Sequence, residues 1–398
     1  MSEVTTPTAP AEAPSVAGYT LWQLVGYMLG LGTWGFGGPV ALVGYMYRDL
    51  VEKRRWISES DYKEGMAIAQ LMPGPLAAQL AIYLGYVHYH LLGATLVGLA
   101  FVLPSFFMVV AIGMAYVSFG GIGWMQSVFY GVGAAVIGII AMSAYKLTTK
   151  NIGKDKLLWA IFAVSTAITI ITQTESIWLF LGAGVLVWWV RVPPAWLKRN
   201  AANAAASPLV AMFAFDAVDP AKLAKIGTYF AYAGSFVFGS GLAIVPFLYS
   251  GVVKEYGWLT DRQFVDAVAV AMITPGPVVI TTGFIGFLVQ GFWGAVVAAA
   301  ATFLPCYLLT VIPAPYFKKH GKRPAIVAFV DGVTAAAIGA IAGAVVVIGQ
   351  RSITDWITAL LAIVTAVVLW RFKKVQEPVI VVVAAVIGLV VHPLITHT

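Results

Sequence analysis

Charged residues are scarce in this chain. Asp, Glu, Lys and Arg make up 10% of its 398 residues, whereas a typical soluble domain contains about 25%. Hydrophobic residues make up 60%, and the mean hydropathy is +0.88. So few charges cannot cover the water-facing surface of a globular protein of this length, and apolar runs recur from end to end. The composition therefore excludes a soluble protein and predicts a polytopic helical protein whose first partner is the lipid bilayer.

Cysteine, histidine and cofactor-binding motifs are also nearly absent. The only cysteine is Cys306, which excludes an intramolecular disulfide and a thiolate metal cluster. The sequence contains no HExxH and no GxxxxGK[ST] motif, so we expect no metal, no cofactor and no ATP-driven pumping. It has no basic stripe with stacking aromatics, so we expect no nucleic-acid partner.

Lys and Arg are missing from residues 1–20, which therefore lack the basic start of a signal peptide. This segment is rich in Pro, Ala and Thr, and we predict a disordered N-terminal tail. Residues 191–226 are the opposite, because they carry five basic side chains: Arg191, Lys198, Arg199, Lys222 and Lys225. An excess of Lys and Arg marks cytoplasmic loops, so we predict a cytoplasmic linker there.

The rest of the chain is a duplication. Trp56 matches Trp258, and the Pro-Gly-Pro at 73–75 matches the Pro-Gly-Pro at 275–277, both at an offset of 202 (258 − 56; 275 − 73). "FGGP" at 36–39 corresponds to "FGSG" at 238–241, and the motifs follow one another in the same order in both halves. We therefore predict a first repeat over 21–190 and a second over 227–398.

Each repeat contains six apolar blocks, most of them close to the roughly 20 residues that a helix needs to cross a bilayer. Loops that are poor in Lys and Arg in one repeat correspond to loops that are rich in them in the other. For example, "SFGGIGW" in the first corresponds to "KKHGKR" in the second. The halves are therefore predicted to insert upside down relative to one another, an architecture typical of secondary transporters. Inversion requires an odd number of crossings. We predict an all-α fold in which each repeat has about five spanning helices plus a broken, re-entrant pair at Pro-Gly-Pro, with the N-terminus outside.

The Pro-Gly-Pro motif predicts a helix, a break and a second helix. Ser58 and Thr260 are hydroxyl caps for helices that run to about 72 and 274. Proline then removes an amide, glycine permits a reversal, and the next proline suits the first turn of a new helix. The start of a helix presents free amides and the positive end of its dipole, which together bind anions.

The predicted substrate site combines these breaks with the polar groups around them. A bland alternative is that each break is only a packing kink, but two inverted copies with polar flanks favour a binding role. The candidate substrate-binding residues are Gly37, Gly38, Gln70, Pro73, Gly74, Pro75, Gln79, Ser240, Thr274, Pro275, Gly276, Pro277, Thr281 and Thr282.

Each charged side chain near the breaks allows two interpretations, one functional and one structural. The first group is a candidate funnel that concentrates anions, or an anchor obeying the positive-inside rule: Arg48, Arg54, Arg55, Lys254 and Arg262. The second group consists of acids that would couple transport to protons, or would only form a solvated face or a helix cap: Glu64, Asp266 and Asp331.

The order of these motifs resembles the chromate ion transporter family in its long, two-domain form. The likeness rests on "FGGP", "VEKRRWIS", "AQLMPGPLAAQLAIYLGY" and "FVLPSFF" in the first repeat, and on "TPGP" and "TFLPCYL" in the second. The resemblance implies export of chromate across a prokaryotic plasma membrane, which confers chromate resistance, with sulfate as a look-alike substrate. One departure is Leu42, where many members of the family carry a polar residue.

The membrane potential favours export of such an anion. Moving one charge through 100 mV changes its free energy by about 2.3 kcal/mol, and the cell interior is negative, so a dianion is driven outward without another energy source. Proton coupling in an antiporter stays open, as does a homodimer. We weigh two alternatives: a carrier of sulfate or another oxyanion, and a membrane enzyme acting on phosphorylated lipid.

Overall fold

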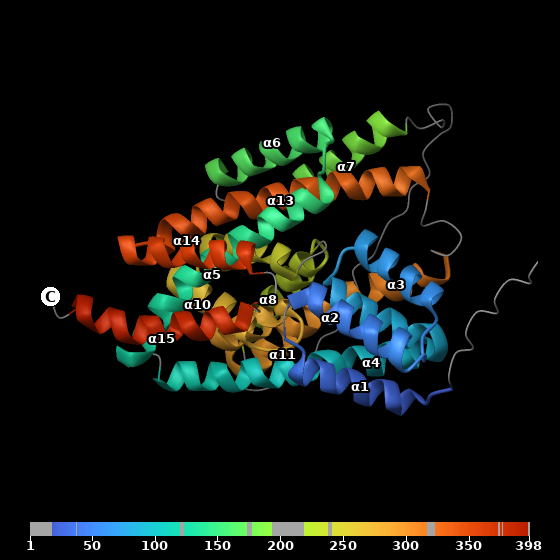
Figure 1. The fold of residues 1–398 in the computed structure, drawn as a ribbon, viewed down its shortest axis with the longest axis horizontal. Helices are drawn as coiled ribbons and strands as arrows, with labels where there is room; N and C mark the ends of the chain where they lie inside the picture. Colours follow the sequence, from blue (N-terminus) through green and yellow to red (C-terminus); the bar gives the residue numbers. More distant parts are fainter. Residues whose placement is uncertain are drawn as a thin grey trace, which may run out of the picture.

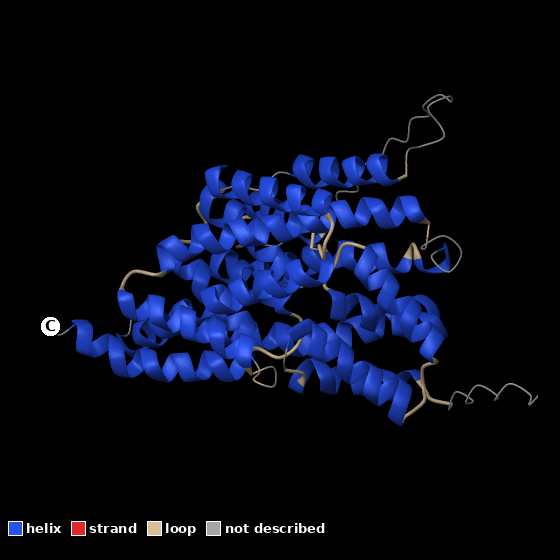
Figure 2. Cartoon of the chain, turned by 45° about the horizontal axis from the view of Figure 1, so that its top comes forward, coloured by secondary structure: helices blue, strands red, loops and turns tan. Residues whose placement is uncertain are grey.

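The computed structural model describes residues 18–36, 38–119, 123–172, 177–192, 219–237, 241–316, 323–372, 375 and 377–396. Within these ranges every regular element is a helix (Figure 2), as the sequence predicts. Our predictions for the start of the tail, for Gly37, for Ser240 and for most of the linker fall on residues outside the described ranges.

The two repeats have a similar order of helices, and Figure 1 labels most of the longer ones. The first repeat contains α1 (Leu21–Trp34), α2 (Gly38–Met46), the π-helix η1 (Tyr47–Lys53), α3 (Glu59–Leu71), α4 (Leu76–Phe119), α5 (Gly123–Asn151), α6 (Lys156–Thr172) and α7 (Ile177–Arg191). The second contains α8 (Pro220–Gly234), η2 (Gly241–Ile244), α9 (Val245–Leu248), the π-helix η3 (Tyr249–Glu255), α10 (Asp261–Ile273), η4 (Val278–Ile280), α11 (Thr281–Val311), α13 (Pro324–Ser352), α14 (Trp356–Arg371) and α15 (Glu377–Thr396). The order differs in that η2 and α9 stand where the first repeat has α2, and the short η4 has no counterpart there.

The two predicted hydroxyl caps start α3 and α10, but they differ in detail. Thr260 forms a full capping box, because its hydroxyl accepts from the Gln263 amide (3.2 Å) and the Gln263 side chain accepts from the Thr260 amide (3.0 Å). Ser58 caps the Asp61 amide at 3.0 Å, but the shorter Asp61 carboxylate accepts from the Ser58 hydroxyl instead (2.5 Å).

α4 and α11 each fold back on themselves. Gly85 and Gly93 touch, since a Cβ added to Gly85 would lie 2.4 Å from the Gly93 carbonyl oxygen. In a straight helix eight residues span about 12 Å, so the chain must reverse between them, at His90 with its φ of +51°. The second repeat makes the same contact between Gly286 and Gly294.

The repeats exchange their later helices. α5 packs against α14 and α15 of the second repeat, and α13 packs against α6 and α7 of the first (Figure 1). Glycines permit the close approach: a Cβ on Gly131 would lie 2.0 Å from the Ala384 carbonyl oxygen, and one on Gly332 would lie 2.4 Å from that of Ala183. These pairs are equivalent (332 − 131 = 384 − 183 = 201). Neither repeat is therefore a closed unit.

The outer surface fits a bilayer. Five segments of the described chain are long and apolar enough to cross a membrane: Leu76–Phe119, Gln126–Thr149, Val278–Tyr316, Pro324–Gln350 and Glu377–Ile395. α6, α7 and α14 are shorter apolar helices. Large apolar side chains such as Ile171 (80% exposed) and Trp178 (78% exposed) point away from the protein, which is favourable only if they contact lipid.

Candidate functional site

The two Pro-Gly-Pro breaks meet the glycine-rich breaks of the opposite repeat. The Gly74 amide donates to the carbonyl of Val237 (2.5 Å), and the Gly276 amide donates to the carbonyl of Gly35 (3.1 Å). The two hydrogen bonds are equivalent under the duplication (276 − 74 = 237 − 35 = 202). The two Pro-Gly-Pro breaks and the two glycine-rich breaks therefore meet at the interface between the repeats. If the repeats are inverted, as the sequence predicts, this interface is where such transporters hold their substrates.

Glycine is required at both breaks. Gly74 has a φ of +143° and Gly276 a φ of +93°, values at which an L side chain is strained. Space is short as well, because a Cβ on Gly74 would lie 2.7 Å from Gln79 Cδ and one on Gly276 would lie 3.0 Å from Ser105 Oγ. The prolines interrupt the helix as predicted, because α3 ends at Leu71 and α4 begins only at Leu76.

Two backbone amides of the Pro-Gly-Pro motifs are not available to a ligand. The amides of Gly74 and Gly276 already donate the cross-repeat hydrogen bonds. The first backbone bond of α4 runs from the Gln79 amide to the Pro75 carbonyl (2.9 Å). The preceding amides, of Leu76, Ala77 and Ala78, belong to the first turn, where helices leave amides without an internal acceptor.

Gln79 covers this first turn. Its side chain is fully buried, and its Nε2 donates to the Pro73 carbonyl at 2.7 Å. The reverse orientation would place two carbonyl oxygens at that distance, so the hydrogen bond fixes which atom is which. Gln79 Oε1 is the only buried side-chain N or O atom of the described residues that has no hydrogen-bond partner.

The remaining polar candidates are partly engaged. Thr274, Thr281 and Thr282 are buried, and each donates its hydroxyl to a carbonyl of its own segment at 2.6, 2.8 and 3.0 Å. Gln70 is exposed near the end of α3, and Gly38 begins α2. Leu42 is fully buried, and its side chain lies 2.5 Å from where a Cβ on Gly35 would stand.

The basic candidates lie at the far ends of α3 and α10 from the breaks: Arg48 in η1, Arg54 and Arg55 just after it, Lys254 in η3 and Arg262 in the first turn of α10. Lys254 is half-buried, and the other four are exposed. The Arg48 guanidinium pairs with Asp49 (3.1 Å), and Arg54 lies over the Trp56 ring at 4.6 Å. Arg55 has a φ of +54° in the turn that follows. In the second repeat Lys254 lies over the Tyr249 ring (5.6 Å), and Arg262 donates to the Gln126 carbonyl (3.3 Å).

Asp49 is a charged partner that the motif analysis did not single out. It accepts hydrogen bonds from Arg48 and forms an ion pair with Lys53 at 3.4 Å. Burial acts to raise the pKa of Asp49, but Arg48 and Lys53 outweigh it and hold the pKa below the ordinary value. Its spacing of four residues from Lys53 was the available signal.

The three acids occupy different surroundings. Asp266 on α10, a helix too short to span, is 3% exposed and accepts from the Tyr116 hydroxyl of α4 at 2.8 Å. Burial raises the pKa of Asp266 against the opposing effects of Tyr116 and Arg262. Asp331 instead pairs with Arg191 (2.5 Å), which also binds Asp155 (2.6 Å). Glu64 is partly buried on α3.

A family model and the curated relatives point to the same family. A family model described as "Chromate transporter" matches residues 22–188 and 224–389, one match in each repeat. The chain is 69% identical over 392 residues to the chromate transport protein of Cupriavidus metallidurans, covering 98% of both chains. It is 62% identical over 376 residues to the probable chromate transport protein of Synechococcus elongatus, covering 94% of this chain and 96% of that one. It is 30% identical to the chromate transport protein of Pseudomonas aeruginosa, over 93% of this chain and 92% of that one. No solved structure matches.

Proposed function

Because the chain belongs to the chromate transporter family, we propose that it exports chromate from the cytoplasm, with the anion held at the paired helix breaks. Family membership makes the chain a multi-pass transporter of a bacterial plasma membrane and not an enzyme. The alternative of an enzyme acting on phosphorylated lipid is therefore set aside.

The observation that carries the proposed site is the pair of cross-repeat hydrogen bonds at Gly74 and Gly276. They hold two helix starts, one from each repeat, against the same interface. The first-turn amides of α4 and of η4 are buried there, and the helix dipole adds positive potential without a charged side chain. A tetrahedral oxyanion has acceptor oxygens on all sides, so it suits donors that converge from two directions.

Gln79 then acts as the group that adjusts to the anion. In the present arrangement its Oε1 is an acceptor, which repels an oxyanion oxygen. A dianion requires the side chain to leave the Pro73 carbonyl and turn its Nε2 to the ligand, whereas hydrogen chromate would donate its own proton to Oε1. Hydrogen chromate would therefore supply the donor that the buried Oε1 lacks. With a dianion, Nε2 exchanges the Pro73 carbonyl for the ligand and Oε1 gains no donor.

The direction of transport follows from charge. Two negative charges leaving through 100 mV release about 4.6 kcal/mol, twice the value for one charge. We propose that this potential drives export and that Asp266 adds a dependence on protons. Sulfate is the second candidate substrate, because it has the same shape and charge as chromate; Leu42 packs at the first break, where a polar side chain would alter selectivity.

Everted membrane vesicles test this function. Labelled chromate uptake is measured while the imposed potential and the pH gradient are varied independently, with unlabelled sulfate as competitor. We expect uptake to follow the potential, and a flux that followed only the pH gradient would overturn the account of the driving force.

Gly74→Leu tests the site in the same vesicles. We expect it to abolish uptake, because a side chain at a φ of +143° is strained and displaces Gln79. Gly153→Leu is the matched control, since Gly153 also has a positive φ (+56°) but has open space around it. Uptake at the wild-type rate by Gly74→Leu, at an equal amount of protein in the membrane, would remove the breaks from the mechanism.

A further inference from the structure

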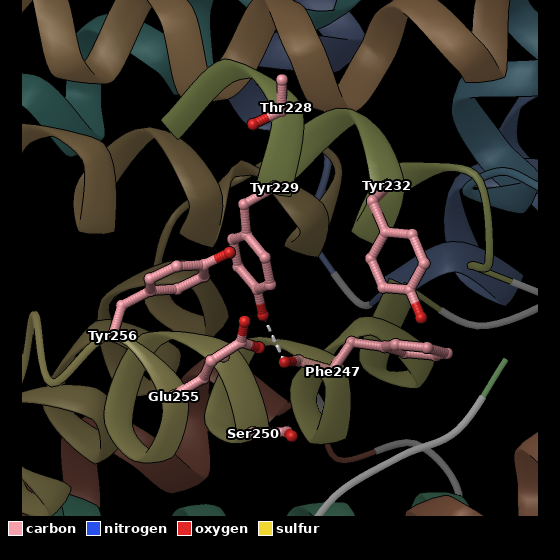
Figure 3. A pocket seen from close by; sticks show the side chains of 8 residues that line it. Thr228, Tyr229, Tyr232, Phe247, Ser250, Glu255 and Tyr256 are labelled. Carbon is pink, nitrogen blue, oxygen red and sulfur yellow. Dashed lines mark hydrogen bonds between the residues drawn. The ribbon is translucent and has the colours of Figure 1, made fainter. Parts of the chain in front are cut away.

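A cavity of about 310 Å³ lies in the second repeat, between α8 and η3 (Figure 3). None of its lining residues belongs to the candidate substrate-binding set, and the proposed transport mechanism makes no use of it. Aromatic rings form its walls: Tyr229 and Tyr232 come from α8, Phe247 from α9, and Tyr256 follows η3. Tyr232 and Tyr256 are both 37% exposed, so the cavity is open to the surroundings.

The rings are held in place. Tyr229 is buried and donates its hydroxyl to the Phe247 carbonyl (Figure 3). Tyr256 meets Tyr229 edge-on, with ring centroids 5.4 Å apart, and stacks on Trp258 at 4.6 Å. Aromatic faces arranged in this way attract cations, because the ring quadrupole is negative at the face.

One carboxylate completes the lining. Glu255 is exposed at the end of η3, and Figure 3 shows its side chain directed towards the rings of Tyr229 and Tyr256. Among the described residues, no Lys, Arg or His forms an ion pair with it. The cavity therefore combines aromatic rings with a carboxylate that interacts with the Tyr256 hydroxyl and has no ion-pair partner within the described part of the chain.

At the equivalent position of the first repeat, the protein supplies a cation of its own. There the Arg48 guanidinium lies over the Tyr45 ring at 5.2 Å and pairs with Asp49 at 3.1 Å. The equivalents of Arg48 and Tyr45 in the second repeat are Ser250 and Phe247 (250 − 48 = 247 − 45 = 202). Gly251 stands where the first repeat has Asp49, and Glu255 stands where it has Lys53 (251 − 49 = 255 − 53 = 202). The second repeat has thus lost the guanidinium, but it still has an aromatic ring and, at a different position, an acid.

We propose that this cavity binds an alkylammonium group, supplied by a lipid headgroup such as phosphatidylethanolamine or by a free amine. The ammonium takes the place that Arg48 fills in the first repeat. Its charge pairs with Glu255, and its carbons lie against Phe247 and the tyrosines. Trp258 beside the cavity is typical of residues at headgroup depth, where lipid ammonium groups are found.

Two variants test the site in the full-length protein. Ser250→Arg restores the guanidinium of the first repeat and should fill the cavity with the protein's own cation. Glu255→Gln keeps the shape but removes the charge. Glu59→Gln is the control, because it removes an exposed carboxylate from the first repeat, where Glu59 pairs only with Lys63 (2.6 Å). Chromate uptake in vesicles, which needs neither Ser250 nor Glu255, verifies that the variants fold.

Native mass spectrometry of the purified protein counts bound lipid when phosphatidylethanolamine and phosphatidylglycerol with the same acyl chains are offered. We expect the wild type and Glu59→Gln to retain phosphatidylethanolamine preferentially, and the two cavity variants to bind it about tenfold more weakly. Ethanolamine and tetramethylammonium are added in a second arm, and the unfolding temperature is recorded.

The outcomes separate the sources of the ammonium. A lipid preference without stabilisation by free amines identifies a headgroup site, and stabilisation by both identifies a general ammonium site. Equal retention of the two lipids combined with no stabilisation by either amine would overturn the proposal. So would unchanged binding in Ser250→Arg and Glu255→Gln.

Discussion

Asp266 is the acid whose surroundings most resemble a protonation site. It is 3% exposed, and its partner Tyr116 comes from the other repeat, so its charge is sensitive to how the repeats are placed. Because burial raises its pKa, the carboxyl is neutral at low pH and becomes anionic only as pH rises well beyond the ordinary range of an aspartate. An anionic carboxylate near the pathway repels an oxyanion.

We therefore expect the wild-type uptake rate to fall as pH rises at a fixed potential, and Asp266→Asn to be insensitive to pH over the same range. Chromate uptake by vesicles with matched pH on both sides is the measurement. Glu64→Gln, at the equivalent position of the first repeat (266 − 64 = 202), is the control that should keep the wild-type response. The same pH dependence in wild type and Asp266→Asn would exclude this carboxyl.

At the scale of single elements, glycine contacts decide how closely the exchanged helices pack. Gly131 on α5 touches the backbone of α15 at Ala384, so a larger side chain forces the two helices apart. Overpacking of this kind typically costs about 1–3 kcal/mol, and more where backbone blocks relaxation. Gly182 also lies within an apolar helix, α7, but a Cβ added there would have no atom within 4 Å.

Gly131→Leu should therefore lower the unfolding temperature of the detergent-purified protein, whereas Gly182→Leu should leave it nearly unchanged. Gly332→Leu, at the equivalent contact with Ala183, should match Gly131→Leu in size. If Gly182→Leu were as destabilising as the other two, the close contacts between exchanged helices would not explain the effect.

At the scale of the whole molecule, the repeats are not independent folding units. α5 buries its surface on α14 and α15, and α13 buries its surface on α6 and α7. Cys306 of α11 also belongs to the hydrophobic core built mainly from the first repeat. A repeat expressed alone would expose all of these faces.

We expect a chain cut within residues 193–218 to transport chromate when both halves are produced together, because that cut removes none of the described contacts. Each half produced alone should be degraded and confer no chromate resistance. Growth on chromate and immunoblots of the membrane fraction provide the test. A single half that persisted in the membrane at the level of the full chain would contradict the exchanged packing.

The helical membrane class, the duplication, the caps at Ser58 and Thr260 and the family could all be predicted before the fold was known. The membrane class follows from composition, and the caps follow from short-range chemistry, because a cap or a proline acts on its own helix within a few residues. The duplication follows from the order of the motifs, and the family from the resemblance that this order carries. Sequence reasoning also placed the polar candidates near the breaks and the anion on the helix-start amides after Pro75 and Pro277, but it assigned no partner to the Gly74 amide.

Only the tertiary structure decided where that amide goes. Its acceptor, the Val237 carbonyl, lies 163 positions away in sequence (237 − 74) and is identified by no local pattern. The same holds for the unpaired Oε1 of Gln79, for the Asp266–Tyr116 bond and for the ion pair that engages Asp331. Burial and partner choice depend on which helices the fold brings together, and three of these contacts (Gly74–Val237, Asp266–Tyr116 and Arg191–Asp331) join segments of different repeats.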